Sequence, residues 1–380
     1  MAEAYDVLVI GGGIVGAACA HELGRAGLRV GIVEQRGIGT GATSAGMGHL
    51  VALDDSAAQL ALSRYSLKLW GELADELPED CEYRRCGTLW VAADEDELRL
   101  AREKRGRYAS AGVAAAVLDE RQVSEAEPNL RRGLAGGLLV PGDAAVHPAS
   151  AARFLVKRSG AEVIAKGAKE VRDGEARLSD GSVVTAGAVV NAAGTAAAGL
   201  TPELSIRSRK GHIATAEPGA GFASHQVVEL GYVKSTHAEE GDSVVFNVRQ
   251  NRNGELLIGS SRQYGREGEI EDAQVEPGMI ERLFARAAEY MPALAEARPL
   301  RRWAGFRAGT PDGLPLIGRC PGYKNVFAAA GHEGLGATTS LGTGRLIADW
   351  ILGRASEIER APYEPARLSV PVSPDTIGGA

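Results

Sequence analysis

The chain opens on a short run of apolar residues that ends in glycines. YDVLVI (5–10) is followed by GGGIVGAACAHELGRAG, with small residues on one helical face, and then by a second apolar run, LRVGIVEQ. Short apolar runs that end in turn residues are typical of buried parallel strands, and Gly27 is placed to end the helix. The pattern predicts a strand–helix–strand unit within about thirty residues.

Further along, segments of this type alternate with segments richer in antiparallel strand. Helices are predicted at 57–77, 94–112, from Pro148, at 276–294 and at the end of 326–353, and the charged helix 94–112 is expected to be a solvated face. CGTLWVAA (86–93) reads as a strand, and 225–262 alternates in polarity. The order predicts a nucleotide-binding domain built from 1–82, 141–206 and 304–360, a second domain built from 83–140 and 207–303, and a tail, 361–380.

The first turn carries chemistry as well as structure. Gly11, Gly13 and Gly16 fit GxGxxG between a strand and a helix, and Glu34 ends the next strand. The glycines allow a tight turn and close approach of a pyrophosphate, which meets the helix N-terminus, while the carboxylate can accept from ribose hydroxyls. The Gly/Ser/Thr-rich stretch RGIGTGATSAGMGHL (36–50) offers further backbone and hydroxyl donors, as a second phosphate and ribityl chain would need. We therefore expect FAD rather than NAD.

Composition narrows the class of protein. The formal net charge is −7, and no stripe of Lys and Arg reverses it, so a nucleic-acid partner is not expected. No apolar run reaches the roughly 18 residues of a membrane span, and no signal peptide precedes the first strand. The four cysteines are scattered, which favours structural thiols over a metal site. We expect a cytoplasmic protein, or one peripheral to the inner membrane.

A second motif surrounds Arg307. GFRAGTPDGLPLIG (305–318) places four glycines and two prolines around this single cation. A guanidinium held so rigidly can pair bidentately with a carboxylate at a fixed place. The alternative is a surface arginine paired with a neighbour such as Asp312.

Four blocks, taken together, resemble the D-amino-acid oxidase superfamily of FAD enzymes, which includes glycine oxidase, sarcosine oxidase and D-amino-acid dehydrogenases. They are DVLVIGGGIVGAACAHEL with Glu34; GATSAGMGHL; AGAVVNAAGTAAAGL; and GFRAGTPDGLPLIG with AAAGHEGLGATTSLGTG. Within that family, AGMGHLVALDD, CGTLWVAADE, VELGYV and GHEGLG are most similar to D-hydroxyproline (imino acid) dehydrogenases, themselves similar to hydrogen cyanide synthase subunits.

The resemblance implies a fold and a cofactor site. It implies an α/β fold with a Rossmann-like FAD-binding domain of the glutathione-reductase type and an inserted α+β substrate domain on an antiparallel sheet. The residues that match flavin contacts are Gly11, Gly13, Ile14, Val15, Gly16, Glu34, Gln35, Arg36, Thr43, Ser44, Ala45, Gly46, Met47, Gly48, Ala168, Ala193, Gly194, Gly305, Arg307, Gly331, His332, Glu333, Gly334, Leu335 and Gly336. The loop 331–336 precedes a helix whose N-terminal amides could stabilise negative charge on reduced flavin.

On the substrate side, the resemblance implies that Arg307 binds the substrate carboxylate and acts as the catalytic positioning group. Asn247 stands where glycine oxidase has a tyrosine, and Arg249, which should share a strand face with it, is either a second anion contact or a surface arginine. His49 is either a pocket residue or a structural histidine, and Tyr232 is a further candidate.

Departures from the family bear on flavin attachment and on the electron acceptor. Gly305 stands where sarcosine oxidases attach flavin through cysteine, so noncovalent FAD is expected. Leu257 replaces the lysine that sarcosine oxidase uses to activate oxygen, which favours a dehydrogenase that passes electrons to a quinone or carrier protein over one that uses oxygen.

The expected reaction is hydride transfer from Cα of a small D-amino or imino acid to flavin N5, giving an imine. cis-4-Hydroxy-D-proline and D-proline are the preferred substrates. The alternatives are glycine or sarcosine oxidation, a flavoprotein subunit of a hetero-oligomeric dehydrogenase or cyanide synthase, and an NAD-binding dehydrogenase. A homo-oligomer is equally compatible with the sequence.

Overall fold

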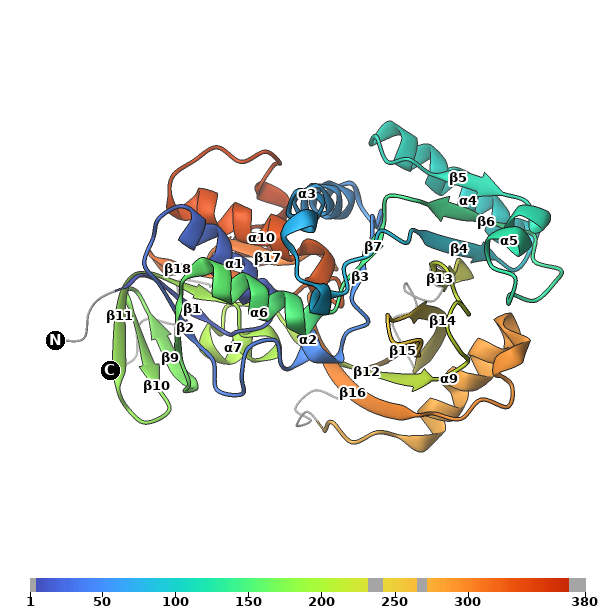
Figure 1. Ribbon diagram of the computed structural model, residues 1–380. Helices are drawn as coiled ribbons and strands as arrows, with labels where there is room; N and C mark the ends of the chain where they lie inside the picture. The colour runs from blue at the N-terminus through green and yellow to red at the C-terminus, as the bar shows by residue number, and fades with distance from the viewer. Residues whose placement is uncertain (1–4, 232–241, 265–271, 369–380) are drawn as a thin grey trace, which may run out of the picture.

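The computed structural model describes residues 5–231, 242–264 and 272–368. Its elements form two large sheets that lie side by side, joined by a small ribbon of β3 (His49–Leu50) and β7 (Ala144–Ala145) (Figure 1). Each sheet has its own helices and its own buried apolar core. The chain therefore builds the two-part α/β architecture that the alternating pattern predicts.

The first sheet has the strand order β17-β18-β11-β1-β2-β8, in which β10 also pairs with the first residues of β11, and β9 pairs with β10. Its neighbours from β18 to β8 are parallel, and β17 is antiparallel. Its strands are β1 (Tyr5–Ile10), β2 (Val30–Val33), β8 (Glu162–Ile164), β9 (Ala168–Arg172), β10 (Glu175–Leu178), β11 (Val183–Asn191), β17 (Leu316–Arg319) and β18 (Val326–Ala330).

Helices α1, α3, α6 and α10 pack together against this sheet (Figure 1). Gly344 on α10 allows the close approach of α10 to α1, because a Cβ at that position would lie 2.6 Å from the Ala18 carbonyl carbon. The helices in this half are α1 (Ile14–Arg25), α2 (Ala42–Ala45), α3 (Ala57–Leu73), α6 (Pro148–Ser159), α7 (Ala197–Leu200) and α10 (Gly336–Ile351).

The second sheet has the order β16-β12-β15-β14-β13-β4-β6-β5, and its neighbours are antiparallel except for the β13–β4 pair. Its strands are β4 (Thr88–Ala92), β5 (Ala116–Leu118), β6 (Gly136–Val140), β12 (Arg207–Ala216), β13 (Gln226–Glu229), β14 (Ser243–Gln250), β15 (Leu256–Tyr264) and β16 (Arg301–Gly309). Helices α4 (Glu95–Ser110), α5 (Glu120–Ala126) and α9 (Pro277–Tyr290) cover it. Short 3-10 turns are Ala74–Glu76, Glu79–Cys81, Gly194–Ala196, Pro292–Leu294, Ala361–Tyr363 and Pro365–Leu368.

Two expectations need correction. Residues 301–309, which include Arg307, form strand β16 and pair along their whole length with β12. The domain boundary expected at residue 304 therefore falls inside a strand of the second sheet. Helix α4 is also not simply a solvated face: Leu98, Lys104 and Tyr108 are buried beneath it. Local composition does not reveal strand pairing or the depth at which a charged helix is packed.

Candidate functional site

A cavity of about 1580 Å³ runs from the first sheet to the second. Its walls come from the turn after β1, the segment 33–56, the ends of β11 and β18, and strands β12, β14 and β16. Of the residues expected at a site, those lining it are Gly11, Gly13, Ile14, Val15, Glu34, Gln35, Arg36, Thr43, Ser44, Ala45, Gly46, Met47, Gly48, His49, Ala168, Ala193, Gly194, Asn247, Gly305, Arg307, Gly331, His332, Glu333, Gly334, Leu335 and Gly336. The fold therefore gathers segments from the whole chain around one space.

The three motif glycines have distinct geometric roles. Gly11 has φ of +107°, and a Cβ there would lie 2.5 Å from the Ala192 carbonyl oxygen. Gly16 is not a lining residue, but a Cβ on it would lie closer than 3.0 Å to the Gly11 carbonyl oxygen, so its role is helix–strand packing. Helix α1 begins at Ile14 after Gly13, which offers no side-chain cap. The positive end of α1 is therefore turned toward the cavity with backbone amides suited to a phosphate.

Glu34 stands at the end of β2, beside this turn. Its carboxylate accepts from the Gly12 amide at 2.8 Å and from the Arg36 amide at 2.7 Å. These bonds fix the carboxylate at the cavity wall, and carboxylate oxygens can each accept more than one hydrogen bond. Its position suits the hydroxyls of a bound ribose.

The loop after β2 forms the next part of the wall. The Thr43 hydroxyl accepts from the Ile14 amide at 2.9 Å and so ties α2 to the start of α1. The backbone then passes Gly48, where φ is +77° and a Cβ would lie 3.1 Å from the Val146 carbonyl carbon. Only glycine fits that approach without rearrangement. The loop thus brings residues 43–49 along the cavity as a strip of backbone and small side chains.

The loop 331–336 and helix α10 close the cavity at the other side. Glu333 and Gly334 take φ of +43° and +83°, and α10 begins after Leu335 without a side-chain cap. Because four residues at this N-terminus, 334–337, line the cavity, a second positive helix end faces the same space. Glu333 pairs with Arg209 at 3.0 Å, which fixes the loop to β12.

Arg307 extends from β16 into the cavity, and its surroundings are shaped for a guanidinium. Nη1 donates to the Ser261 carbonyl at 2.9 Å. A Cβ on Gly211 would lie 2.7 Å from Arg307 Cζ, and one on Gly334 would lie 3.3 Å from Cδ. Asp312, the alternative partner, instead pairs with Arg367 at 2.7 Å.

Apolar side chains line the cavity on the side of the second sheet. Leu53, Trp90 and Val228 belong to one buried cluster, with Leu335 packed against it, and Met47 and Ile213 belong to another with Leu257 and Trp303. Of these, sequence reasoning assigned a site role only to Met47 and Leu335. The sequence around Leu53 and Trp90 gives no local signal for a role in the site, because the pattern of each segment predicts only that these residues are buried.

His49 and Asn247 both line the cavity, and each has a buried polar atom without a hydrogen-bond partner among the described residues: Nε2 of His49 and Oδ1 of Asn247. Burial and the nearby Arg249 charge lower the pKa of His49 to about 3, so its imidazole is neutral at physiological pH. Because these two atoms are themselves buried, either side chain must turn before its unpartnered atom can contact a ligand.

Arg249 and Tyr232 differ from the other candidates. Arg249 is 3 % exposed and is not a lining residue, and its guanidinium donates to the carbonyl oxygens of Met47 and Val146. Burial lowers its pKa to about 10. The expectation of a second anion contact at Arg249 is therefore wrong in this structure: the strand carries it past the cavity, where it holds the loop that bears Met47. Tyr232 lies outside the described residues.

Metal centres and membrane spans are not found in the part of the chain that the structure describes. Across residues 5–231, 242–264 and 272–368, no group of three His, Cys, Asp or Glu side chains is arranged to hold a metal. None of the helices in those same ranges combines the length and the apolar character needed to cross a bilayer.

The cavity fits an extended dinucleotide with a second, redox-active ring system. One end offers the α1 N-terminus and Glu34, the middle offers the strip 43–49, and the other end offers α10 beside an arginine and apolar walls. Gly305 borders the middle, where a Cβ would lie closer than 3.0 Å to Ala45 Cβ. A side chain that could form a covalent link does not fit at that position.

Comparison with known proteins agrees with this geometry. A family model described as FAD-dependent oxidoreductase (DAO) matches residues 6–350. A glycine oxidase from Geobacillus kaustophilus is 30% identical, covering 97% of this chain and 98% of its own, and its crystal structure superposes with a TM-score of 0.85 over 96% and 98% of the two chains. A D-amino acid dehydrogenase from Methylobacterium nodulans is 28% identical (95% and 98% covered), and the hydrogen cyanide synthase subunit HcnC from Pseudomonas aeruginosa is 25% identical (97% of each covered).

Proposed function

The chain belongs to the DAO family of FAD-dependent oxidoreductases, and we propose that it oxidises the C–N bond of a small D-amino or imino acid, with D-proline or cis-4-hydroxy-D-proline as its substrate. The observation that carries the proposal is Arg307. It lines the cavity from β16, and its guanidinium is held by the Ser261 carbonyl above the space left by Gly211.

In this proposal Arg307 binds the substrate carboxylate through two parallel N–H donors. The strand and the two neighbouring glycines hold the fork in one orientation, so the substrate's Cα is placed by its carboxylate alone. FAD, held by the α1 N-terminus, Glu34 and the strip 43–49, would supply the redox chemistry as the hydride acceptor. The protein's contribution is orientation and electrostatics.

The other polar groups complete the substrate's surroundings. Asn247 lines the cavity, and a turn of its side chain would let the unpartnered Oδ1 accept from the substrate nitrogen, while the neutral His49 adds no competing charge. The N-terminal amides of α10 favour negative charge at that end of the cavity. An amine that loses electrons and a ring system that gains them would each meet groups of suitable polarity.

The apolar walls favour an imino acid over glycine. Leu53, Trp90 and Val228 can bury ring carbons, and each buried methylene contributes about 0.8 kcal/mol of binding. Glycine would leave these walls without contacts. Glycine or sarcosine oxidation remains the alternative activity, supported by the similarity to glycine oxidase.

For the electron acceptor we propose a quinone or carrier protein rather than oxygen. Leu257 is 7 % exposed and packs with Met47 and Ile213 in an apolar cluster, so that position supplies no cation to support superoxide-like charge. The similarity to HcnC also supports a second arrangement, in which this chain is the flavoprotein subunit of a hetero-oligomer.

The proposal is tested by anaerobic substrate mixing. Purified protein is placed in separate cuvettes with D-proline, cis-4-hydroxy-D-proline, L-proline, glycine, sarcosine and D-alanine, and the oxidised flavin band is followed. We expect the D-imino acids to bleach it fastest, and we expect a soluble quinone to restore it faster than air. Bleaching by glycine and sarcosine alone would replace the substrate proposal with the alternative. A flavin-loaded chain that no compound reduces, but that a copurifying subunit makes competent, would favour the hetero-oligomer.

A further inference from the structure

Residues 51–54 cross the cavity wall between β3 and α3, and side chains hold their backbone. The amides of residues 51–53 donate to Oγ1 of Thr338 at 3.2 Å, to Oδ1 of Asp143 at 2.9 Å and to Oγ of Ser63 at 3.2 Å. These partners come from α10, the turn before β7 and α3, which are far apart in the sequence. Side chains thus do here what backbone pairing does in a strand.

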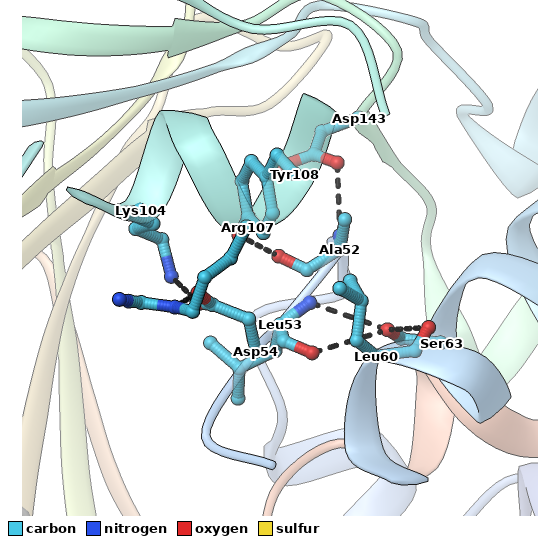
Figure 2. Close-up of polar contacts among 9 residues, drawn as sticks. All are labelled: Ala52, Leu53, Asp54, Leu60, Ser63, Lys104, Arg107, Tyr108 and Asp143. Atoms are coloured by element: carbon cyan, nitrogen blue, oxygen red, sulfur yellow. Dashed lines mark hydrogen bonds and ion pairs between the residues drawn. The ribbon is translucent and has the colours of Figure 1, made fainter. Parts of the chain in front are cut away.

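The carbonyls of this 51–54 segment are held in the same way. The Tyr108 hydroxyl donates to the Ala52 carbonyl at 2.7 Å, and the Ser63 hydroxyl shares its proton between the Leu60 carbonyl at 3.2 Å and the Leu53 carbonyl at 3.4 Å. Figure 2 shows Tyr108 reaching the segment from α4 on one side, while Ser63 reaches it from α3 on the other. The segment is therefore clamped between helices that belong to the two halves of the molecule.

Asp54 anchors the end of the segment through charge. It forms an ion pair with Lys104, and Oδ2 accepts from Nε of Arg107 at 2.7 Å (Figure 2). Asp54 and Lys104 side chains are only 4% and 3% exposed, so removing Asp54 would leave the Lys104 ammonium buried without this carboxylate. The Lys104 ammonium also lies 4.8 Å from the centroid of the Trp90 ring. One cation thereby links the 51–54 segment to the neighbouring part of the cavity wall.

Val51 and Leu53 are the residues of the segment that line the cavity, and Leu53 packs in the same cluster as Trp90 and Val228. Asp143, Tyr108, Lys104 and Arg107 are not lining residues, so they can affect a ligand only through the 51–54 segment and the Trp90 ring that Lys104 contacts. This separates wall-forming residues from the residues that position them.

We propose that Asp143 and Tyr108, together with the Asp54–Lys104 pair, are positioning residues that set substrate specificity by fixing the Leu53–Trp90 wall. The inference rests on the proposed function and deepens it. The wall recognises the apolar carbons of a ring or side chain, while Arg307 recognises the carboxylate that every candidate substrate shares. Loosening the clamp therefore weakens binding of a ring-bearing carboxylate and leaves binding of a carboxylate without a ring unchanged.

Two ligands that flavin cannot oxidise allow the test to be made without turnover. Pyrrole-2-carboxylate carries a ring and acetate does not, and the Kd of each is measured from the change in flavin absorbance of the holoenzyme. For Asp143→Ala we expect the Kd of pyrrole-2-carboxylate to rise about tenfold, as when about two ring carbons are no longer buried against the wall. We expect the Kd of acetate to change less than about twofold. For turnover of D-proline, KM should rise while kcat stays within about threefold.

Conservative variants and a matched control separate positioning from general damage. Asp143→Asn keeps an acceptor for the Ala52 amide and should restore binding, whereas Tyr108→Phe should weaken ring binding in the same direction. Glu127 provides the control: it is fully buried, accepts from the Ser224 and His225 amides at 2.9 and 2.6 Å, and does not line the cavity. Glu127→Ala removes an equivalent clamp and should leave both Kd values unchanged.

Clear outcomes overturn the inference. The inference fails if Asp143→Ala raises the Kd of both ligands equally. It also fails if the folded, flavin-loaded variant shows no change in either Kd. If Asp143→Ala yields no holoenzyme, Leu53→Ala is measured instead. An unchanged Kd of pyrrole-2-carboxylate in that variant would show that the Leu53–Trp90 wall does not bind the ring, and the inference would fail. Failure of D-proline to reduce flavin, with selective loss of pyrrole-2-carboxylate binding, would reject the proposed substrate and leave the positioning role standing.

Discussion

Gly211→Ala is the sharpest perturbation of the carboxylate site, because it adds one methyl group and removes nothing. The new Cβ would lie 2.7 Å from both Cζ and Nη2 of Arg307, whereas ordinary contacts begin at 3.4 Å. The guanidinium must therefore retreat by roughly 1 Å, and a displacement of that size can reduce catalysis about a hundredfold. The expected loss in kcat/KM corresponds to about 2.7 kcal/mol.

Arg307→Ala provides the scale for this loss. It removes two charge-assisted hydrogen bonds of about 1.5–3 kcal/mol each, so kcat/KM should fall by about 10² to 10⁴. Arg307→Lys keeps the charge but loses the two parallel N–H donors. Its kcat/KM should therefore lie between that of the wild type and that of Arg307→Ala. The assay is anaerobic flavin reduction by D-proline over a range of concentrations, with flavin content measured for each variant.

Gly278→Ala is the matched control, because no atom lies within 4 Å of a Cβ at that position and its φ is not left-handed. The kcat/KM of Gly278→Ala should match that of the wild type. Arg307 would not be the carboxylate site if flavin-loaded Gly211→Ala kept full affinity and rate, or if the flavin of Arg307→Ala were reduced as fast as that of the wild type at low substrate concentration. Either result would show that the carboxylate is bound elsewhere.

Three further predictions concern the cofactor and the buried carboxyl. Gly16→Ala should yield protein without yellow colour, because its Cβ would lie 3.1 Å from the Gly11 carbonyl carbon and closer than 3.0 Å to its oxygen; a full flavin content would contradict the packing role. Acid precipitation of the wild type should release all its flavin, since Gly305 has no room for a linking side chain; colour kept in the pellet would contradict this. Burial raises the pKa of Asp143 to about 7, so the folded state binds its proton more tightly than the unfolded state and this group's stabilisation is lost between about pH 4 and pH 7. The melting temperature of Asp143→Asn minus that of the wild type should therefore increase between about pH 4 and pH 7. A difference that does not change with pH would contradict the raised pKa of Asp143.

The sequence predicts the fold well where the signal is local. β1, α1 and β2 follow from an apolar run, a glycine turn and a second apolar run, and α3, α6, α9 and α10 lie where helical patterns place them. Long apolar or amphipathic runs need no knowledge of distant partners. The strand character of residues 301–309 was missed because glycines weaken its pattern, while pairing with β12 stabilises it.

The candidate site divides in the same way. Residues in glycine-rich motifs were predicted by position, because turns and helix starts are encoded within a few residues. Leu53, Trp90 and the side chains that clamp residues 51–54 could not be predicted, since their partners lie up to 287 residues away in sequence. Arg249 was misplaced for a related reason: alternation gives the face of a strand but not how far along it the cavity extends.

The decisive measurement is anaerobic mixing of the flavin-loaded chain with D-proline and with D-proline deuterated at Cα. We expect both compounds to bleach the oxidised flavin band, and the deuterated compound to do so several times more slowly because the Cα–H bond breaks in that step. We expect Arg307→Ala to need a far higher concentration of either compound. A band left unchanged by D-proline, by cis-4-hydroxy-D-proline and by glycine would contradict the claim that this cavity oxidises the C–N bond of an amino or imino acid.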